Sequence, residues 1–188
     1  MKKLLAIIAA SAMIPAAAFA AGELTFVTDT GTATGFDGPF VFQADGTTKL
    51  DSTYVGQVYA GASQGSLAAV GTPVQFGLFS GSPNAAANGV ILSGTVSVSG
   101  VNGGDAGFYQ IKAWQGGTSS TFAGASIKGE SDIVAVTFGG TPAGGGTAVP
   151  APNVDGFQSF NVVPEPGSVA LGILGLGGLI AARRRKND

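Results

Sequence analysis

The residues of this chain that could carry out acid–base chemistry are carboxylates, because its 188 residues include no histidine and no cysteine. Glu130 and Asp132 form the closest carboxylate pair, and such pairs perform glycoside hydrolysis in many enzymes. At positions i and i+2 of a strand, both side chains would lie on one face of a sheet. We favour a simpler interpretation, in which both are solvated residues at the start of a strand. Without histidine, the familiar serine triad cannot form either.

Metal and phosphate sites were considered from the spacing of acidic and glycine residues. Four aspartates beside turn-forming residues could offer oxygen ligands to calcium: Asp29, Asp37, Asp45 and Asp105. No stretch has the dense ligand spacing of a calcium-binding loop, so we expect these aspartates to form turns. The glycine-rich segment 139–146 lacks the Gly-Lys-Ser/Thr of a phosphate loop. The sequence therefore predicts no catalytic, cofactor-binding or metal-binding residue, and we expect the protein not to be an enzyme.

Four aromatic residues allow two interpretations: Tyr54, Tyr59, Phe108 and Trp114. If exposed in a row, they would form a platform for stacking on sugars, as in a carbohydrate-binding module for exopolysaccharide. If buried, they would fill the core of a small β domain. We favour core packing and keep carbohydrate binding as an alternative.

The first 20 residues have the three-part organisation of a secretory signal peptide. Lys2 and Lys3 precede an apolar stretch from Leu4 to Ile14, and small residues follow at Ala18 and Ala20. This order predicts cleavage after Ala20 and export by the general secretion machinery. The predicted domain organisation is thus a signal peptide (1–20), a middle domain (21–163) and a C-terminal segment (164–188).

The C-terminal segment combines a proline motif, an apolar span and a basic tail. Pro164-Glu165-Pro166 favours an extended, exposed backbone, because proline restricts itself and its predecessor. The apolar residues 169–182 would span about 21 Å as a helix, which is short for a hydrocarbon core of about 30 Å. The positive-inside rule places the basic tail on the cytoplasmic side. The tail comprises Arg183, Arg184, Arg185 and Lys186.

This combination resembles the PEP-CTERM sorting domain throughout residues 164–188. The resemblance implies recognition by an exosortase, a membrane-embedded cysteine protease-transpeptidase of Gram-negative bacteria. It also implies cleavage near the motif and transfer from the inner membrane to the cell surface or extracellular matrix. The alternative is an ordinary single-span anchor that keeps the domain in the periplasm.

The middle domain carries three lysines and nine acidic residues, a net charge of −6, which disfavours nucleic-acid binding. Alternating polar and apolar residues, separated by glycine-rich turns, predict an all-β fold, a single antiparallel β-sandwich of the immunoglobulin-like kind. It would be flanked by the N-terminal signal helix and a short C-terminal transmembrane helix. We also expect a helical turn within 121–128 and a loop over 139–152. The expected strands are 24–28, 39–43, 54–61, 74–79, 90–98, 108–115, 133–138 and 157–162.

The middle domain also resembles, less specifically, a domain that recurs in exported PEP-CTERM proteins. The matching stretches include residues 54–60, 109–114, 129–139 and 156–160. That resemblance supports location and fold and implies no activity. The resulting hypothesis is a non-enzymatic exported protein of the cell surface or matrix. Its predicted partners are the exosortase, the membrane and exopolysaccharide.

Overall fold

A computed structural model describes residues 21–29, 31 and 36–165, which fold mainly as β-strands with two 3-10 turns, η1 (Gln64–Ser66) and η2 (Ala85–Ala87). No α-helix lies among these residues. The strands are β1 (Gly22–Val27), β2 (Val41–Phe42), β3 (Tyr54–Gly61), β4 (Ala68–Gln75), β5 (Leu78–Phe79), β6 (Ser82–Pro83), β7 (Leu92–Val98), β8 (Ala106–Gln115), β9 (Ile127–Glu130), β10 (Val134–Thr137), β11 (Phe160–Asn161) and β12 (Val163–Pro164).

A six-stranded sheet forms one layer of the molecule, with the order β12-β9-β8-β3-β4. β10 pairs with β8 on the same side as β9, and β3 pairs antiparallel with β8 along its whole length. Tyr109, Ile111 and Ala113 of β8 point to the same face of the sheet, because side chains alternate along a strand, and all three belong to the main hydrophobic core. One face of the sheet is therefore turned to the core, and we call the other its outer face.

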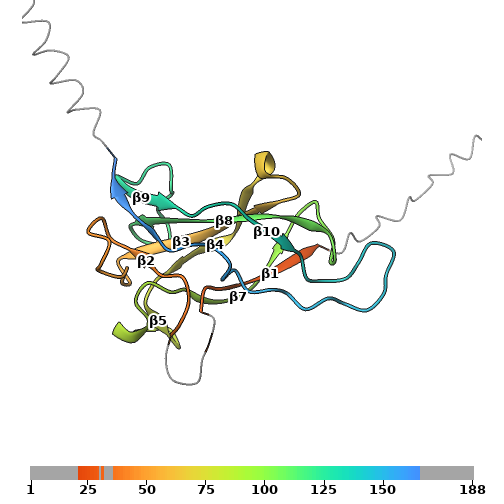
Figure 1. Ribbon diagram of the computed structural model, residues 1–188, viewed down its shortest axis with the longest axis horizontal. Coiled ribbons are helices and arrows are strands. Elements are labelled where there is room, and N and C mark those ends of the chain that lie inside the picture. The colour runs from red at the N-terminus through yellow and green to blue at the C-terminus, as the bar shows by residue number, and fades with distance from the viewer. Residues whose placement is uncertain (1–20, 30, 32–35, 166–188) are drawn as a thin grey trace, which may run out of the picture.

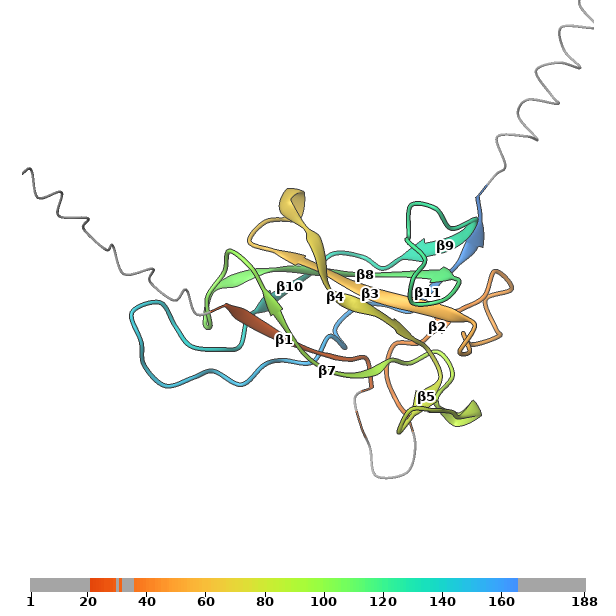
Figure 2. The same ribbon diagram turned by 180° about the vertical axis from the view of Figure 1, so that it is seen from behind.

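The β1–β7 pair packs against the core-facing side of the large sheet (Figure 1, Figure 2). β1 alternates strictly between buried and half-buried residues, which gives it one core-facing side. Two smaller pairs, β2–β11 and β5–β6, complete the described strands. β2 and β11 run parallel to each other, whereas the other strand pairs are antiparallel.

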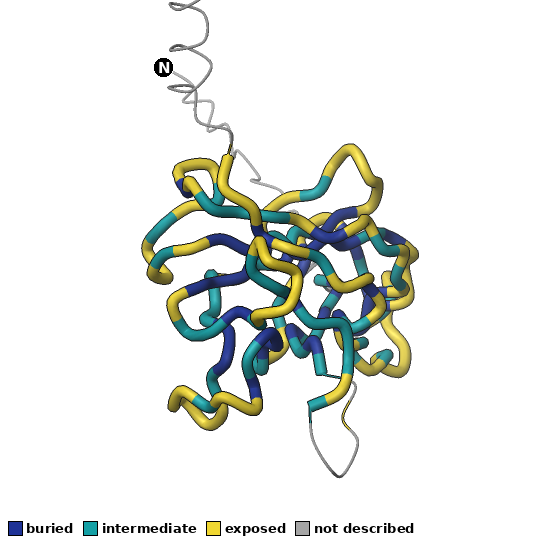
Figure 3. Tube along the Cα trace, turned by 60° about the vertical axis from the view of Figure 1, so that its left-hand side comes forward, coloured by how far each residue is buried: buried dark blue, intermediate teal, exposed yellow. Residues whose placement is uncertain are grey.

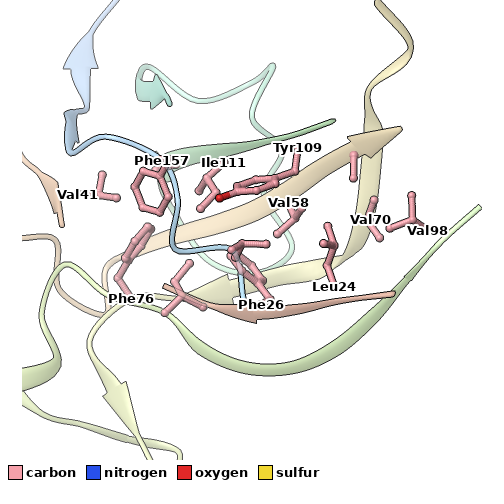
Figure 4. Close-up of a cluster of buried hydrophobic side chains, with 14 of the residues drawn as sticks. Leu24, Phe26, Val41, Val58, Val70, Phe76, Val98, Tyr109, Ile111 and Phe157 are labelled. Carbon is pink, nitrogen blue, oxygen red and sulfur yellow. The ribbon is translucent and has the colours of Figure 1, made fainter. Parts of the chain in front are cut away.

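The hydrophobic core lies between these layers (Figure 4). Leu24 and Phe26 from β1 face Val58 of β3 and Tyr109 and Ile111 of β8, and all five are nearly inaccessible to solvent. Buried residues lie mainly in the interior of the molecule and exposed residues mainly in its outer loops (Figure 3). Burial of apolar side chains at about 25 cal/mol per Å² is thus what holds the layers together.

The expected mainly β fold is confirmed, but the strands are arranged differently from the expectation. The strands fall into four sheets, with one parallel pair, so a single antiparallel, immunoglobulin-like sandwich is not shown. The strand at 54–61 is found as predicted. The signal helix and the transmembrane helix fall outside the described residues. Within those residues, no helix is long and apolar enough to cross a membrane.

The expected helical turn within 121–128 is found only as a short turn, and the end of that range belongs to a strand. A hydrogen-bonded turn covers 122–124, but Ile127–Glu130 forms β9. Glycine at 129 allows the backbone of Asn161 to pass close to β9, because a Cβ there would collide with the Asn161 carbonyl oxygen. The segment at 139–152 is mainly irregular, as expected, apart from bridges at its ends.

Candidate functional site

β12, close to the end of the described residues, is an edge strand of the large sheet and pairs antiparallel with β9. Val163 lies opposite Lys128, and Pro164 opposite Ile127. One residue further along, the backbone N–H of Glu165 donates to the carbonyl of Ser126 at 2.9 Å. Two residues of the Pro-Glu-Pro motif are therefore hydrogen-bonded or paired to the edge of the domain. The third, Pro166, lies outside the described residues.

A proline fits at position 164 because of the hydrogen-bond pattern of the strand pair. In an antiparallel pair, residues that exchange hydrogen bonds alternate with residues that do not. Glu165 donates to Ser126, so Pro164 falls at the position whose N–H would point away from β9. Proline has no N–H to lose there, which is why edge strands tolerate it. The expected extended and exposed backbone is found, and it is docked on a neighbouring strand.

A salt bridge closes this docking site. The Nζ of Lys128 lies 2.7 Å from Oε1 of Glu165, with exposed fractions of 18% for the lysine side chain and 56% for the glutamate. Lys128 and Glu165 reach each other because their positions on the paired strands are diagonal neighbours on one face. The carboxylate of the motif is thus neutralised by one of the three lysines of the middle domain.

A second ion pair lies beside the first on the outer face of the sheet. Lys112 of β8 is directly opposite Glu130 of β9, and their charged atoms are 3.0 Å apart. The Nζ atoms of Lys112 and Lys128 lie 4.8 Å and 5.1 Å from the ring centre of Phe122. Phe122 in turn packs edge-on against the buried Trp114. The two lysines are therefore held over one aromatic ring and have little freedom to move.

The chain changes from buried to exposed within one residue just before the motif. Val162 is fully buried, whereas Val163 is 51% exposed. Upstream, Phe157 belongs to the core, and the N–H of Gly156 donates to the Tyr109 hydroxyl at 2.9 Å. Burial raises the pKa of Tyr109 to about 12, and the nearby Asp155 and Asp132 carboxylates add to the shift. The C-terminal segment is firmly anchored up to Val162 and weakly attached beyond it.

The structure gives Glu130 and Asp132 different partners. Glu130 pairs with Lys112 on the outer face, while Oδ1 of Asp132 accepts a hydrogen bond from the N–H of Gln158 at 3.1 Å. Between them, Ser131 is buried and exchanges hydrogen bonds with the backbone of Ile111, in the segment that joins β9 to β10. Both carboxylates are exposed and engaged in structural contacts. Their arrangement supports the solvated interpretation.

Three of the four aspartates that could offer ligands to calcium accept hydrogen bonds from backbone N–H groups. Asp29 accepts from residues 31 and 37, Asp45 from residues 47 and 48, and Asp105 from Asn102. The hydroxyl and N–H groups of Thr48 and Thr47 lower the pKa of Asp45 to about 2. No group of three or more acidic side chains that could hold a metal ion occurs among the described residues. Turn formation is thus confirmed for Asp45 and Asp105. Residues 30 and 32–35, which follow Asp29, lie outside the described residues.

The four aromatic residues do not form an exposed row. Trp114 and Tyr54 are buried, which confirms core packing for both. Tyr59 and Phe108 are half-buried on the outer face. Trp114 donates from Nε1 to the Ser120 hydroxyl at 2.9 Å and so satisfies its polar atom inside the fold. Exopolysaccharide binding stays a prediction, now without two of its four proposed stacking residues.

Comparison with known families identifies the C-terminal segment. Residues 162–186 match the family model of the PEP-CTERM protein-sorting motif. This chain carries a PEP-CTERM sorting motif. The motif marks it as an exported protein targeted to an exosortase. The match begins at Val162, the last buried residue before the exposed strand β12. No curated protein and no solved structure matches the chain.

The PEP-CTERM match includes the basic residues expected at the tail, Arg183 to Lys186. They lie outside the described residues, as do the apolar span 169–182 and the cleavage residues Ala18 and Ala20, so those roles stay predictions. Sequence reasoning missed Lys128 and Ser126, which hold the motif. The signal that could have found Lys128 is its rarity, because only three lysines occur between residues 21 and 163.

Proposed function

We propose that this protein is a non-enzymatic component of the cell surface or extracellular matrix of a Gram-negative bacterium. The signal peptide delivers it to the secretion machinery, and an exosortase cleaves it near the PEP-CTERM motif. The observation that supports this function is the motif at 162–186, whose first proline and glutamate lie exposed at one edge of the large sheet.

The proposal that the middle domain is not an enzyme is supported by the engagement of its acidic side chains. Glu130 is paired with Lys112, and Asp132 is bonded to the Gln158 backbone. Hydrolysis by two carboxylates requires a proton donor and a second carboxylate placed on either side of a substrate bond. If the purified protein degraded the host's exopolysaccharide and Glu130→Gln abolished that degradation, the non-enzymatic proposal would be wrong.

Intact mass of the protein isolated from a host with a matching exosortase tests the sorting proposal. We expect a mature chain that begins at Ala21 and has lost the apolar span together with Arg183–Lys186. In an otherwise identical strain that lacks the exosortase, the C-terminal segment should be retained. A variant with Pro164→Ala and Pro166→Ala should resemble wild-type protein in the deletion strain. Retention of the basic tail in the presence of the enzyme would favour simple anchoring.

A further inference from the structure

We propose that the edge of β9 is an intramolecular receptor for the sorting motif, and that exosortase acts on the chain only after β12 has left this edge. Lys128 and Ser126 are the receptor residues that contact the motif directly. This inference rests on the proposed function, because it concerns the step that presents the motif to the enzyme.

While the motif is docked, the groups that an enzyme would recognise in an extended peptide are already bonded to the domain. An enzyme that binds an extended segment uses its backbone N–H and C=O groups together with pockets for its side chains. In the structure, the N–H of Glu165 is donated to Ser126 and its carboxylate is paired with Lys128. The enzyme has to replace both contacts with its own. The receptor edge and the exosortase therefore compete for the same atoms.

The motif can leave without unfolding the domain. Val162 remains buried, and β12 contributes only two exposed residues beyond it. The contacts that must break are the short β12–β9 pairing, the hydrogen bond to Ser126 and a half-exposed ion pair. Contacts of this kind each shift an equilibrium by only a few-fold. The detached state is thus accessible at ordinary temperature, and removal of one contact raises its population measurably.

The first experiment compares two lysines that form similar ion pairs on the same face of the sheet. Lys128→Met removes the salt bridge to the motif and keeps an apolar side chain over Phe122. Lys112→Met removes the neighbouring pair with Glu130, which does not contact β12. The full-length chains are expressed in the exosortase host, and conversion to the mature form is followed by pulse-chase. Because the motif has to leave β9 before it is cleaved, we expect Lys128→Met to be processed about 2- to 5-fold faster than wild type.

Lys112→Met should be processed at the wild-type rate. Lys128→Glu, which places a like charge diagonally across from Glu165, should be processed at least as fast as Lys128→Met. Equal rates for wild type and all three variants would overturn the role of the salt bridge. Slower processing of Lys128→Met would overturn it as well, because it would mean that the exosortase itself uses Lys128.

The second experiment holds β12 on β9 with an engineered disulfide. The chain contains no native cysteine, so the two introduced cysteines have no other cysteine of the chain to pair with. Val163 and Lys128 are directly opposite partners, and paired strand residues have Cα separations of about 5.5 Å, within the range of disulfides. Full-length Val163→Cys/Lys128→Cys protein in detergent is mixed with membranes that contain the exosortase. We expect the oxidised form to resist cleavage and the form reduced before mixing to be cleaved. The two single-cysteine variants, treated with the same oxidant, show whether the oxidant itself changes the activity of the exosortase.

The two proposals fail in different ways. If wild-type protein is not processed in any condition, the proposed function fails. If wild type and the reduced double variant are processed and the fully oxidised variant is cleaved at the same rate, sorting stands and the receptor proposal is overturned. Mass spectrometry of the oxidised sample confirms that the disulfide has formed before the rates are compared.

Discussion

β1 and β12 are the first and last strands of the described chain: β1 follows the predicted signal peptide, and β12 lies within the PEP-CTERM motif. β1 is paired with β7 on one side, and on the other its backbone bonds to residues 139, 152 and 154. Its side chains Leu24 and Phe26 lie in the core. β12 is paired on one side only, and both of its residues are exposed.

This difference suits the two processing steps that we propose for the two ends of the domain. The N-terminal strand lies at the centre of the fold, so the residues directly after the predicted signal peptide are needed for folding. The C-terminal strand lies at the periphery, so it can be transferred to an enzyme while the domain stays folded. Local stability differs along a chain in this way whenever few buried contacts hold one segment.

The largest expected effect comes from truncating the N-terminal strand. Phe26→Ala should lower the free energy of unfolding by about 3–5 kcal/mol, because it leaves a cavity in the core. Val163→Ala, the corresponding truncation in β12, should change it by less than about 0.5 kcal/mol, because that side chain is 51% exposed. Chemical denaturation of the exported protein, followed by tryptophan fluorescence, measures both. Similar losses for the two variants would contradict the comparison.

A second prediction concerns the junction with the signal peptide. A Cβ at Gly22 would lie 2.7 Å from Cγ2 of Val101 and 3.0 Å from Cβ of Phe138. Gly22→Ala should therefore destabilise the domain by about 1–3 kcal/mol through overpacking. Gly94→Ala in the partner strand β7 is the matched control, because a Cβ there meets nothing within 4 Å. A lower midpoint of thermal unfolding for Gly22→Ala, and an unchanged one for Gly94→Ala, is the expected result.

The central strands β3 and β8 were predictable from the sequence, whereas the edge strand β9, which holds the motif, was not. β3 and β8 are long and rich in β-branched and aromatic residues, so local pattern suffices to find them. β9 has the sequence Ile-Lys-Gly-Glu, with one large apolar residue and an internal glycine, and such a segment carries almost no strand signal. Its stability comes from β8 and from the segment around Asn161, both distant in sequence.

The docking of the motif was hidden for a related reason. A proline ordinarily argues against a strand. Only the hydrogen-bond pattern of the β12–β9 pair shows that residue 164 would donate no hydrogen bond to β9, so proline costs none there. The candidate site thus followed from sequence as far as the motif itself. Its receptor became visible only when Lys128 and Ser126 were placed beside Glu165.

A third prediction tests the anchor that separates the fixed and detachable parts of the C-terminal segment. Tyr109→Phe removes the acceptor of the Gly156 N–H and should cost about 0.5–1.5 kcal/mol at neutral pH. Because the pKa of Tyr109 is raised from 10.0 to about 12, the unfolded chain releases this proton first as the pH rises. Wild-type stability from this residue is complete below pH 10 and is lost between about pH 10 and pH 12.

Unfolding curves recorded from pH 8 to pH 12 check this prediction. Tyr109→Phe should lose less stability across the alkaline range than wild type does. Tyr59→Phe, on the outer face, is the control and should retain the wild-type alkaline loss because Tyr109 is unchanged. A parallel decline for wild type and Tyr109→Phe would remove the proposed contribution of the buried hydroxyl.

The smallest effect distinguishes a detachable strand from one that unfolds with the domain. Hydrogen exchange at the Glu165 amide should be about 2- to 5-fold faster in Lys128→Met than in wild type, because an exposed ion pair contributes little. Exchange in β8 should stay unchanged, since β12 leaves without it. Lys112→Met should show the converse, with a slight effect on β8 and β9 and none at Glu165. If Lys128→Met accelerated exchange at Glu165 and in β8 equally, β12 would be opening with the whole domain, and the motif would be no more available than the core.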